Sequence, residues 1–248
     1  MMNLVEIKKS TIREIRETER LVSQTENLIK SIREGGEKVH LIWDFDGVLT
    51  SPRDDDVFFM LNGKTEKYYE YEMRMIKTPL ENGPWAELFD SCGRLQESQD
   101  IVTARSTVAA LRVFSWLSAR DNRLSSVQWM LFIGHQSKIG SYGIILDHFR
   151  GAKDTHIVCV DDSPRHCSDF RDAANARPDM AKRCRDICSP KIRTYDASEI
   201  TEEINAVMSF SGRTRKITVR KPQGDGDSGR VIRVTRNFEK MITDRFRT

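Results

Sequence analysis

The 248-residue sequence predicts an α/β protein built on a mostly parallel sheet. Two observations support this fold class. There are four short apolar runs of strand length, and three of them end in polar residues: VHLIWDF at 39–45, QDIVTARS at 99–106, VQWMLFIG at 127–134 and THIVCVDDS at 155–163. Helix-like stretches separate them, at 106–118, 138–150 and 164–176. Because strands that are apolar along their whole length are buried on both faces, their alternation with helices predicts a doubly wound sheet.

The composition is that of a globular protein. Hydrophobic residues make up 38% of the chain and charged residues 31%, which argues against disorder. The longest apolar runs end after four or five residues, too few to span a membrane. The N-terminal MMNLVEIKKSTIREIRE mixes acids and bases and lacks the apolar core of a secretory signal. We therefore expect a cytoplasmic protein that does not associate with membranes.

The cysteines predict neither a disulfide framework nor a zinc site. There are five, an odd number at irregular spacing. Cys184 and Cys188, with His166 and Cys167 upstream, fit no spacing typical of tetrahedral zinc. We expect free thiols.

An N-terminal helical extension is predicted over residues 1–37. Within it, residues 10–34 have the spacing of a helix, with Ile15, Val22 and Ile29 recurring every seven residues. Packing of this helix on the body of the protein is the simpler interpretation. A short coiled coil between subunits, and hence an oligomer, is the alternative.

The main domain is predicted over 38–208, with a small cap inserted after the first strand at about 51–83. A helix at 68–77, a turn at 79–85 and a core helix at about 84–96 fill this part of the chain. Aromatic residues are concentrated in the cap and predict either its own small core or a surface that stacks on a base. They are Phe58, Phe59, Tyr68, Tyr69 and Tyr71.

The C-terminal extension, 209–248, is basic. From Ser211 to Thr248 there are eleven lysines and arginines against four acids, while the whole chain carries a net charge of only +3. Alternating apolar and basic residues at 216–221 and 230–236 flank a glycine-rich turn, which predicts a β-hairpin. This tail predicts either a solvated sheet edge or a surface for nucleic acid or an acidic partner.

Two carboxylates follow the first predicted strand, in the segment DFDGVLT. Asp44 and Asp46 are separated by one residue, so on an extended chain both side chains point the same way. One carboxylate can attack phosphorus and the other can move the proton of the leaving oxygen. Gly47 allows a sharp turn beside them. A solvated strand end without catalysis is the alternative.

The other predicted strands also end in polar residues suited to phosphate and metal chemistry. The hydroxyl of Thr103 can hold a phosphate oxygen or cap a turn, and Lys138, at a helix start, can offset negative charge. Asp161 and Asp162 supply hard oxygen ligands for Mg²⁺. Asp161 can instead cap the helix that follows. Because ligands of such sheets bind at the carboxyl ends of the strands, we expect these residues to meet.

This set of motifs resembles the haloacid-dehalogenase-like phosphatases over residues 38–175. The resemblance implies a Rossmann-like sheet and Mg²⁺ as cofactor, with Asp44 as nucleophile and Asp46 as general acid and base. Thr103 and Lys138 would bind the phosphoryl group. The metal ligands would come from Asp44, Asp46, Asp161 and Asp162, of which Asp162 is the main acidic ligand and Asp161 stands where many members have glycine. Lys153 is the poorer candidate for the conserved lysine.

A closer resemblance is to the cytosolic 5′-nucleotidase type I family. It rests on the segments YYEYEMRMIKTPLENGPW, TARS, FIGHQSK and VDDSPRH. Ala104 and Arg105 would join the phosphate-binding residues, although a packing role for Arg105 is the alternative. The segment 50–53 departs from the family pattern, which bears on the base and ribose contacts.

The sequence thus predicts a phosphomonoesterase that forms an aspartyl-phosphate and hydrolyses nucleoside 5′-monophosphates. One alternative is a phosphatase of nucleic-acid ends that uses the basic tail. A non-catalytic binding or scaffold protein on the same fold is the other.

Overall fold

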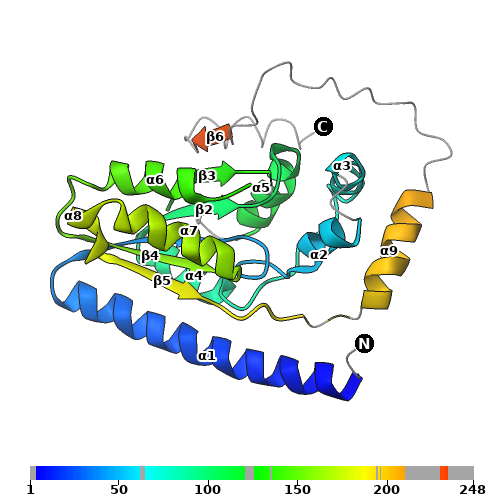
Figure 1. Ribbon diagram of the computed structural model, residues 1–248, viewed down its shortest axis with the longest axis horizontal. Coiled ribbons are helices and arrows are strands. Elements are labelled where there is room, and N and C mark those ends of the chain that lie inside the picture. Colours follow the sequence, from blue (N-terminus) through cyan, green and yellow to red (C-terminus); the bar gives the residue numbers. More distant parts are fainter. Residues whose placement is uncertain are drawn as a thin grey trace.

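A six-stranded sheet forms the centre of the molecule (Figure 1). The computed structural model describes residues 4–61, 65–120, 126–134, 136–193, 195, 197–209 and 230–233. The strands run in the order β5-β4-β1-β2-β3-β6. Their bounds are β1 Lys38–Trp43, β2 Ser98–Thr103, β3 Val127–Phe132, β4 Thr155–Asp161, β5 Cys184–Cys188 and β6 Arg230–Arg233. The first five are parallel and β6 is antiparallel to β3, which confirms the mostly parallel α/β sheet.

Helices precede, connect and follow the strands. They are α1 Leu4–Glu34, α2 Arg53–Met60, α3 Thr65–Arg74, α4 Ala86–Arg94, α5 Ala110–Ser118, α6 Ile139–His148, α7 Pro164–Asn175, α8 Pro178–Ala181 and α9 Ala197–Ser209, with a 3₁₀ turn η1 at Thr107–Ala109. The predicted helices are present with shifts of a few residues at their ends. The sequence analysis missed α2, α8 and β5. In the predicted hairpin, 230–233 is a strand paired with β3, while 216–221 lies outside the described residues.

The two faces of the sheet bury separate apolar clusters, as a doubly wound fold requires. On β1, Leu41 and Trp43 point to one face and Ile42 to the other. The first face packs against α1, α4 and α5, and the second against α6 and α7. This alternation on a fully buried strand explains why the central strands read as continuous apolar runs.

The predicted cap has an apolar core of its own, which α9 completes. Val57, Tyr68 and Tyr71 are buried with Ile200 of α9, which packs against α2 and α3. The rings of Phe58 and Tyr68 meet edge-on at 5.3 Å between centroids. Tyr68 and Tyr71 therefore serve as core of the cap, so the base-stacking alternative does not apply to them. Figure 1 shows α9 beside α2, far along the chain from the cap sequence.

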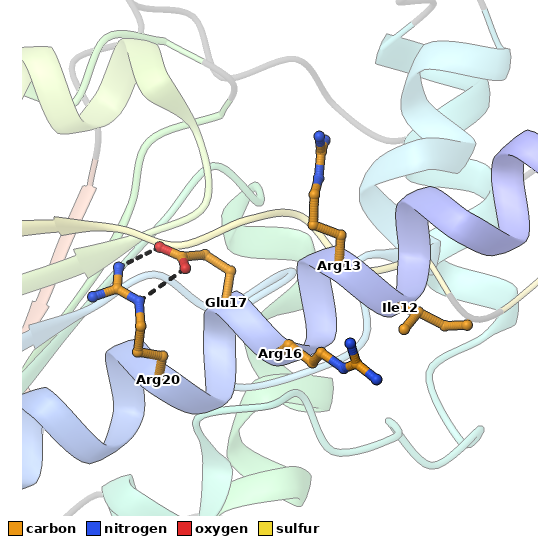
Figure 2. Close-up of a pocket in the computed structure, with 5 residues that line it drawn as sticks. All are labelled: Ile12, Arg13, Arg16, Glu17 and Arg20. Atoms are coloured by element: carbon orange, nitrogen blue, oxygen red, sulfur yellow. Dashed lines mark hydrogen bonds and ion pairs between the residues drawn. The ribbon is translucent and has the colours of Figure 1, made fainter.

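The N-terminal helix packs on the body of the protein, as the simpler interpretation holds. Ile29 and Ile32 are buried in the first apolar cluster. Thr18 and Thr25 face the same side, and each hydroxyl donates to the carbonyl four residues earlier. A pocket on α1 is lined by Ile12, Arg13, Arg16, Glu17 and Arg20, and Figure 2 shows Arg20 donating to Glu17 there. Of the described helices, none has the length and hydropathy needed to cross a membrane.

Candidate active site

The predicted chemical groups meet at the carboxyl edge of the sheet. Asp44 directly follows β1, Thr103 ends β2 and Asp161 ends β4. Because β4, β1 and β2 are adjacent parallel strands, their last residues lie side by side. The sequence argument from strand ends therefore holds geometrically.

A tight turn after β1 shapes the site. The Asp44 backbone N–H donates to the carbonyl of Val160, and the Asp44 side chain accepts a 2.7 Å bond from the N–H of Phe45. Gly47 has a φ of +79°, and a Cβ built there would lie 2.0 Å from Oδ2 of Asp162. Only glycine satisfies both demands, so the turn brings the Asp162 carboxylate against the backbone that carries Asp46.

The segment 79–84 closes over this turn. Gly83 donates its N–H to the carbonyl of Leu49 at 2.8 Å, and a Cβ on Gly83 would lie 2.3 Å from the Val48 carbonyl. The glycine of the Pro-Leu-x-x-Gly-Pro motif is thus needed for close backbone approach. Its role is to hold the turn that carries the two carboxylates.

Lys138 connects two of the carboxylates. It is fully buried just before α6, and its Nζ lies 2.8 Å from Oδ1 of Asp44 and 2.6 Å from Oδ2 of Asp161. The Asp169 carboxylate accepts the Lys138 backbone N–H at 2.8 Å and fixes the start of the helix. Tyr142, one turn later, donates its hydroxyl to Asp161 at 3.0 Å. The lysine therefore reaches the site as predicted.

The charges of this cluster do not balance. Burial would lower the pKa of Lys138, but Asp161 and Asp44 raise it above the usual lysine value. Burial would raise the pKa of Asp161, but Lys138 and His166 lower it. Burial, Asp161 and Asp162 raise the pKa of Asp44 well above its usual range, against the opposite effect of Lys138. One buried ammonium is thus too little positive charge for the carboxylates around it.

That excess of negative charge fits a divalent cation. Asp44 and Asp162 offer hard oxygens of the kind Mg²⁺ prefers, and the charge of Asp162 lies close enough to help raise the pKa of Asp44. A second donor set is Asp44, Asp161 and His166, whose ligand atoms lie within 4.8 Å of one another. The oxygens of Asp161 already accept from Lys138, Tyr142 and the backbone of Ser163. We therefore favour Asp44 and Asp162 as the acidic ligands.

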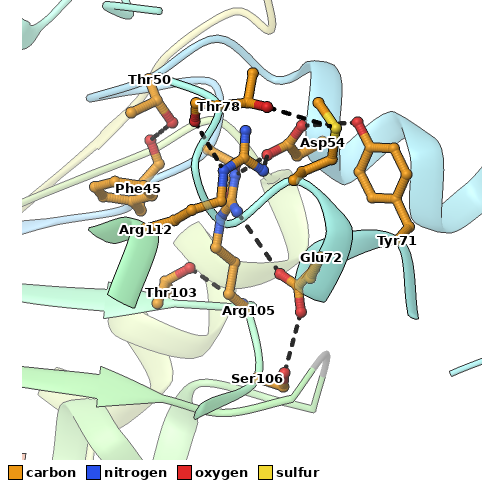
Figure 3. A network of polar contacts seen from close by, with 12 residues as sticks. Phe45, Thr50, Asp54, Tyr71, Glu72, Thr78, Thr103, Arg105, Ser106 and Arg112 are labelled. Atoms are coloured by element: carbon orange, nitrogen blue, oxygen red, sulfur yellow. Dashed lines mark hydrogen bonds and ion pairs between the residues drawn. The ribbon is translucent and has the colours of Figure 1, made fainter. Parts of the chain in front are cut away.

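Arg105 is bonded to Asp46 in this structure. Its guanidinium is 1% exposed and grips both oxygens of Asp46, with Nε 2.8 Å from Oδ2 and Nη2 2.6 Å from Oδ1. The Arg105 backbone N–H donates to the hydroxyl oxygen of Thr103 at 3.1 Å, which leaves the Thr103 proton free to be donated (Figure 3). Ala104, between them, is half-buried.

The cap contributes acids to the same buried cluster. Asp54 of α2 accepts from Arg105 at 2.8 Å and also from Arg112 of α5. Burial would raise the pKa of Asp54, but the two arginines lower it. Glu72 of α3 accepts from the hydroxyl of Ser106 at 3.2 Å and lies 3.6 Å from Arg105 (Figure 3). Core arginines and cap acids thus join the cap to the residues around Asp46.

Glu72 should make the stability of the protein depend on pH. Burial raises its pKa to about 7 from an ordinary value of 4.5. An acid whose pKa is raised on folding stabilises the fold fully below the unfolded pKa, and the effect is lost as pH rises through the folded value. We expect the free energy of unfolding of the wild type to fall by about 3 kcal/mol, relative to Glu72→Gln, between about pH 4 and about pH 8.

Urea unfolding at both pH values measures this difference. Glu66→Gln, on the exposed side of the same helix, is the matched control and should follow the wild type. Equal pH dependence in the wild type and Glu72→Gln would show that Glu72 is ionised at little cost.

Comparisons with known proteins establish no family for the chain. No family model matches the sequence, and no curated protein matches it. Two crystal structures of the Legionella pneumophila effector Ceg4 are similar in structure, one with an N-terminal yeast Hog1p sequence and one with an N-terminal TEV protease cleavage sequence. They are 16% and 17% identical, cover 69% and 70% of this chain and 95% and 94% of their own, and give TM-scores of 0.40 and 0.43. A likeness of this degree does not indicate a shared activity.

The residues of this site that the sequence analysis missed include Asp54, Glu72, Arg112, Tyr142, His166 and Asp169. Glu72 had a signal, because it lies in the glutamate-rich segment YYEYEMR that contributes to the nucleotidase resemblance. His166 follows Asp162 by four residues and was considered only as part of a zinc pattern. Asp54 and Arg112 belong to no sequence motif, because the contact between them depends on how the cap packs against α5.

Proposed function

We propose that the protein is a Mg²⁺-dependent phosphomonoesterase that works through an aspartyl-phosphate on Asp44. The observation that carries this proposal is the position of Lys138, whose buried ammonium joins Asp44 to Asp161. A purely structural strand end has no need of a buried lysine that neutralises a carboxylate against the cost of burial. Because the carboxylates around Lys138 exceed its charge, a phosphate would enter this site together with a divalent cation.

In the proposed reaction, a carboxylate oxygen of Asp44 attacks the phosphorus of the substrate. The bond between phosphorus and the leaving oxygen breaks, and Asp46 donates a proton to that oxygen. Asp46, now ionised, takes a proton from a water molecule, which attacks phosphorus and releases inorganic phosphate from Asp44. Lys138 and the hydroxyl of Thr103 offset the charge that builds on the phosphoryl oxygens.

A bound Mg²⁺ would supply further positive charge at the phosphoryl group. Asp44, Asp162 and the backbone carbonyl of Asp46 would hold it.

Arg105 must move for Asp46 to act as an acid. In the closed arrangement the guanidinium bonds to both Asp46 oxygens and stabilises the ionised carboxylate. A substrate phosphate is the anion best able to draw Arg105 away, because guanidinium binds phosphate and carboxylate in the same bidentate way. Arg105 would then take the phosphate-binding role while Asp46 is released to carry the proton. Movement of the cap accompanies this step, since Arg105 also bonds Asp54.

The first substrates to test are nucleoside 5′-monophosphates. This choice rests on the resemblance to the cytosolic 5′-nucleotidase type I family. The phosphatase of nucleic-acid ends relies on the basic tail, of which only 230–233 lies within the described residues. A non-catalytic scaffold protein would not explain why Asp44, Lys138 and Asp161 are buried together. We therefore place small phosphomonoesters first.

The direct test is phosphate release with Mg²⁺ and with EDTA. The panel contains 5′- and 3′-nucleoside monophosphates, sugar phosphates and a 3′-phosphorylated oligonucleotide. We expect Mg²⁺-dependent release from 5′-monophosphates. Release mainly from the oligonucleotide would transfer the function to nucleic-acid processing, and a cellular role that persists in Asp44→Asn would favour the scaffold.

Metal binding should separate the two donor sets. We expect Asp162→Asn to weaken the affinity for Mn²⁺, a spectroscopic stand-in for Mg²⁺, by about 10–100-fold, and His166→Gln to change it by less than about 2-fold. Electron paramagnetic resonance of the free ion measures this without any turnover. Unchanged affinity in Asp162→Asn, with a loss in His166→Gln, would assign the metal to Asp44, Asp161 and His166 instead.

A further inference from the structure

Two of the five cysteines lie next to the acidic end of β4. All five are free thiols; Cys92, Cys159, Cys167 and Cys184 are buried, while Cys188 is exposed. Cys167 belongs to the first turns of α7, and Cys188 ends β5. The phosphatase chemistry proposed above uses neither of them.

The backbone brings these two residues to the same carbonyl oxygen. Cys188 is the register partner of Asp161 in the parallel pair β4–β5, and the N–H of Ser189 donates to the Asp161 carbonyl at 2.8 Å. The Cys167 thiol lies 3.6 Å from that same oxygen. Both cysteines therefore flank Asp161.

Side-chain alternation places Cys188 on the face of β5 that α7 covers. Cys184, on this strand, is buried in the cluster between the sheet and α7. Asp186, two residues on, bonds Arg171 of α7 at 3.0 Å. Cys188 is the next residue on that face, and Cys167 precedes Arg171 by one helical turn. Arg171 with Asp186, and Cys167 with Cys188, are thus neighbouring residue pairs between α7 and β5.

The two cysteines thus lie on facing elements, α7 and β5, and each is next to the Asp161 carbonyl. Cys188 is exposed to solvent and Cys167 is buried. An oxidant that reaches Cys188 therefore finds a second sulfur already beside it.

We propose that Cys167 and Cys188 are an oxidation site, at which a peroxide reversibly forms a disulfide between α7 and β5. The peroxide transfers one oxygen to the sulfur of Cys188, which becomes a sulfenic acid, and one water or alcohol leaves. The sulfur of Cys167 then attacks the sulfenic sulfur, the S–S bond forms and a second water leaves. Two electrons pass from the two thiols to the peroxide. A dithiol reductant reverses the change.

This bond would fix the chain on both sides of Asp161. It would tie the helix that follows Asp162 to the neighbouring strand and limit movement of the acidic loop. The proposal itself does not depend on the phosphatase activity, because its test reads the thiols directly.

The test treats the folded, full-length protein with hydrogen peroxide and maps the disulfide after trypsin without reduction. We expect the peptides HCSDFR (166–171) and DICSPK (186–191) to be joined, with two of the five thiols lost and both restored by dithiothreitol. Cys184→Ser, on the same strand and face, should still form the link. Cys188→Ser should not form it, and peroxide should raise the melting temperature of the wild type but not of Cys188→Ser.

Three outcomes would overturn the proposal. One is a disulfide that joins another pair of cysteines. Another is Cys188 oxidised to sulfinic or sulfonic acid while Cys167 remains a thiol. The third is retention of all five thiols at peroxide levels that oxidise free glutathione.

Discussion

Replacing Asp44 by asparagine is expected to abolish phosphate release while leaving the fold intact. The substitution removes the attacking carboxylate, so we expect kcat/KM to fall on the order of 10⁴-fold or more. The amide keeps the size of the side chain and can still accept from Lys138 and from the Phe45 N–H. Steady-state phosphate release with the best substrate of the panel measures the loss.

The same variant has a predictable effect on stability. Because the pKa of Asp44 is raised on folding, its contribution is fully present below the unfolded pKa and is lost as pH rises through the folded value. At neutral pH, Asp44→Asn should therefore unfold at the same temperature as the wild type or at a higher one. Asp172→Asn, exposed on α7, is the control and should change neither activity nor stability. A destabilised Asp44→Asn would show that the ionised carboxylate supports the fold.

Replacing Lys138 by methionine should produce the largest loss of stability. Methionine keeps most of the volume but leaves Asp44 and Asp161 buried without their shared cation. Breaking a buried pair in this way costs about 3–5 kcal/mol of the free energy of unfolding. The pKa of Lys138 is raised on folding, so its contribution is complete below the ordinary lysine value. The contribution of Lys138 should thus be fully present at neutral pH, where the variant is compared with the wild type.

Urea unfolding of Lys138→Met against Lys153→Met tests this expectation. Lys153 is exposed before β4, and its replacement should change stability by less than about 0.5 kcal/mol. Equal stability of the two variants would mean that Asp44 and Asp161 are protonated or hydrated in solution. The ammonium of Lys138 would then not be what keeps them ionised.

Local pattern was enough to predict the central strands and the groups at their ends. Buried parallel strands are apolar along their whole length, so β1 and β4 stand out from a charged background, and their carboxyl ends must meet. The strand β5 was missed for the opposite reason. It lies at the edge of the sheet, and Arg185 and Asp186 interrupt its apolar pattern.

Long-range pairing was beyond the reach of that pattern. Ile200 completes the core of the cap although α9 follows the last strand of the parallel sheet, and nothing local in α9 indicates this partner. The contact between Arg105 and Asp46 was missed for the same reason, because it depends on residues far apart in the sequence. The other hydrogen-bond partner of the Arg105 guanidinium, Asp54, comes from a helix that the sequence analysis did not predict. The residues of a site at strand ends can therefore be predicted from the sequence. The contacts that the cap makes with them cannot.

The central claim is that Asp44 carries the phosphoryl group during turnover, and trapping that group tests it most directly. Enzyme would be mixed with substrate and Mg²⁺, quenched in acid, digested, and the peptide that contains Asp44 examined by mass spectrometry. With an aryl phosphate, whose leaving oxygen needs no proton, Asp46→Asn should accumulate the intermediate, because Asp46 activates the water that hydrolyses it. We predict one added phosphoryl group on Asp44 in this variant and none in Asp44→Asn. Phosphate release by the wild type with the phosphoryl group on another residue, or with none trapped in Asp46→Asn, would contradict the account.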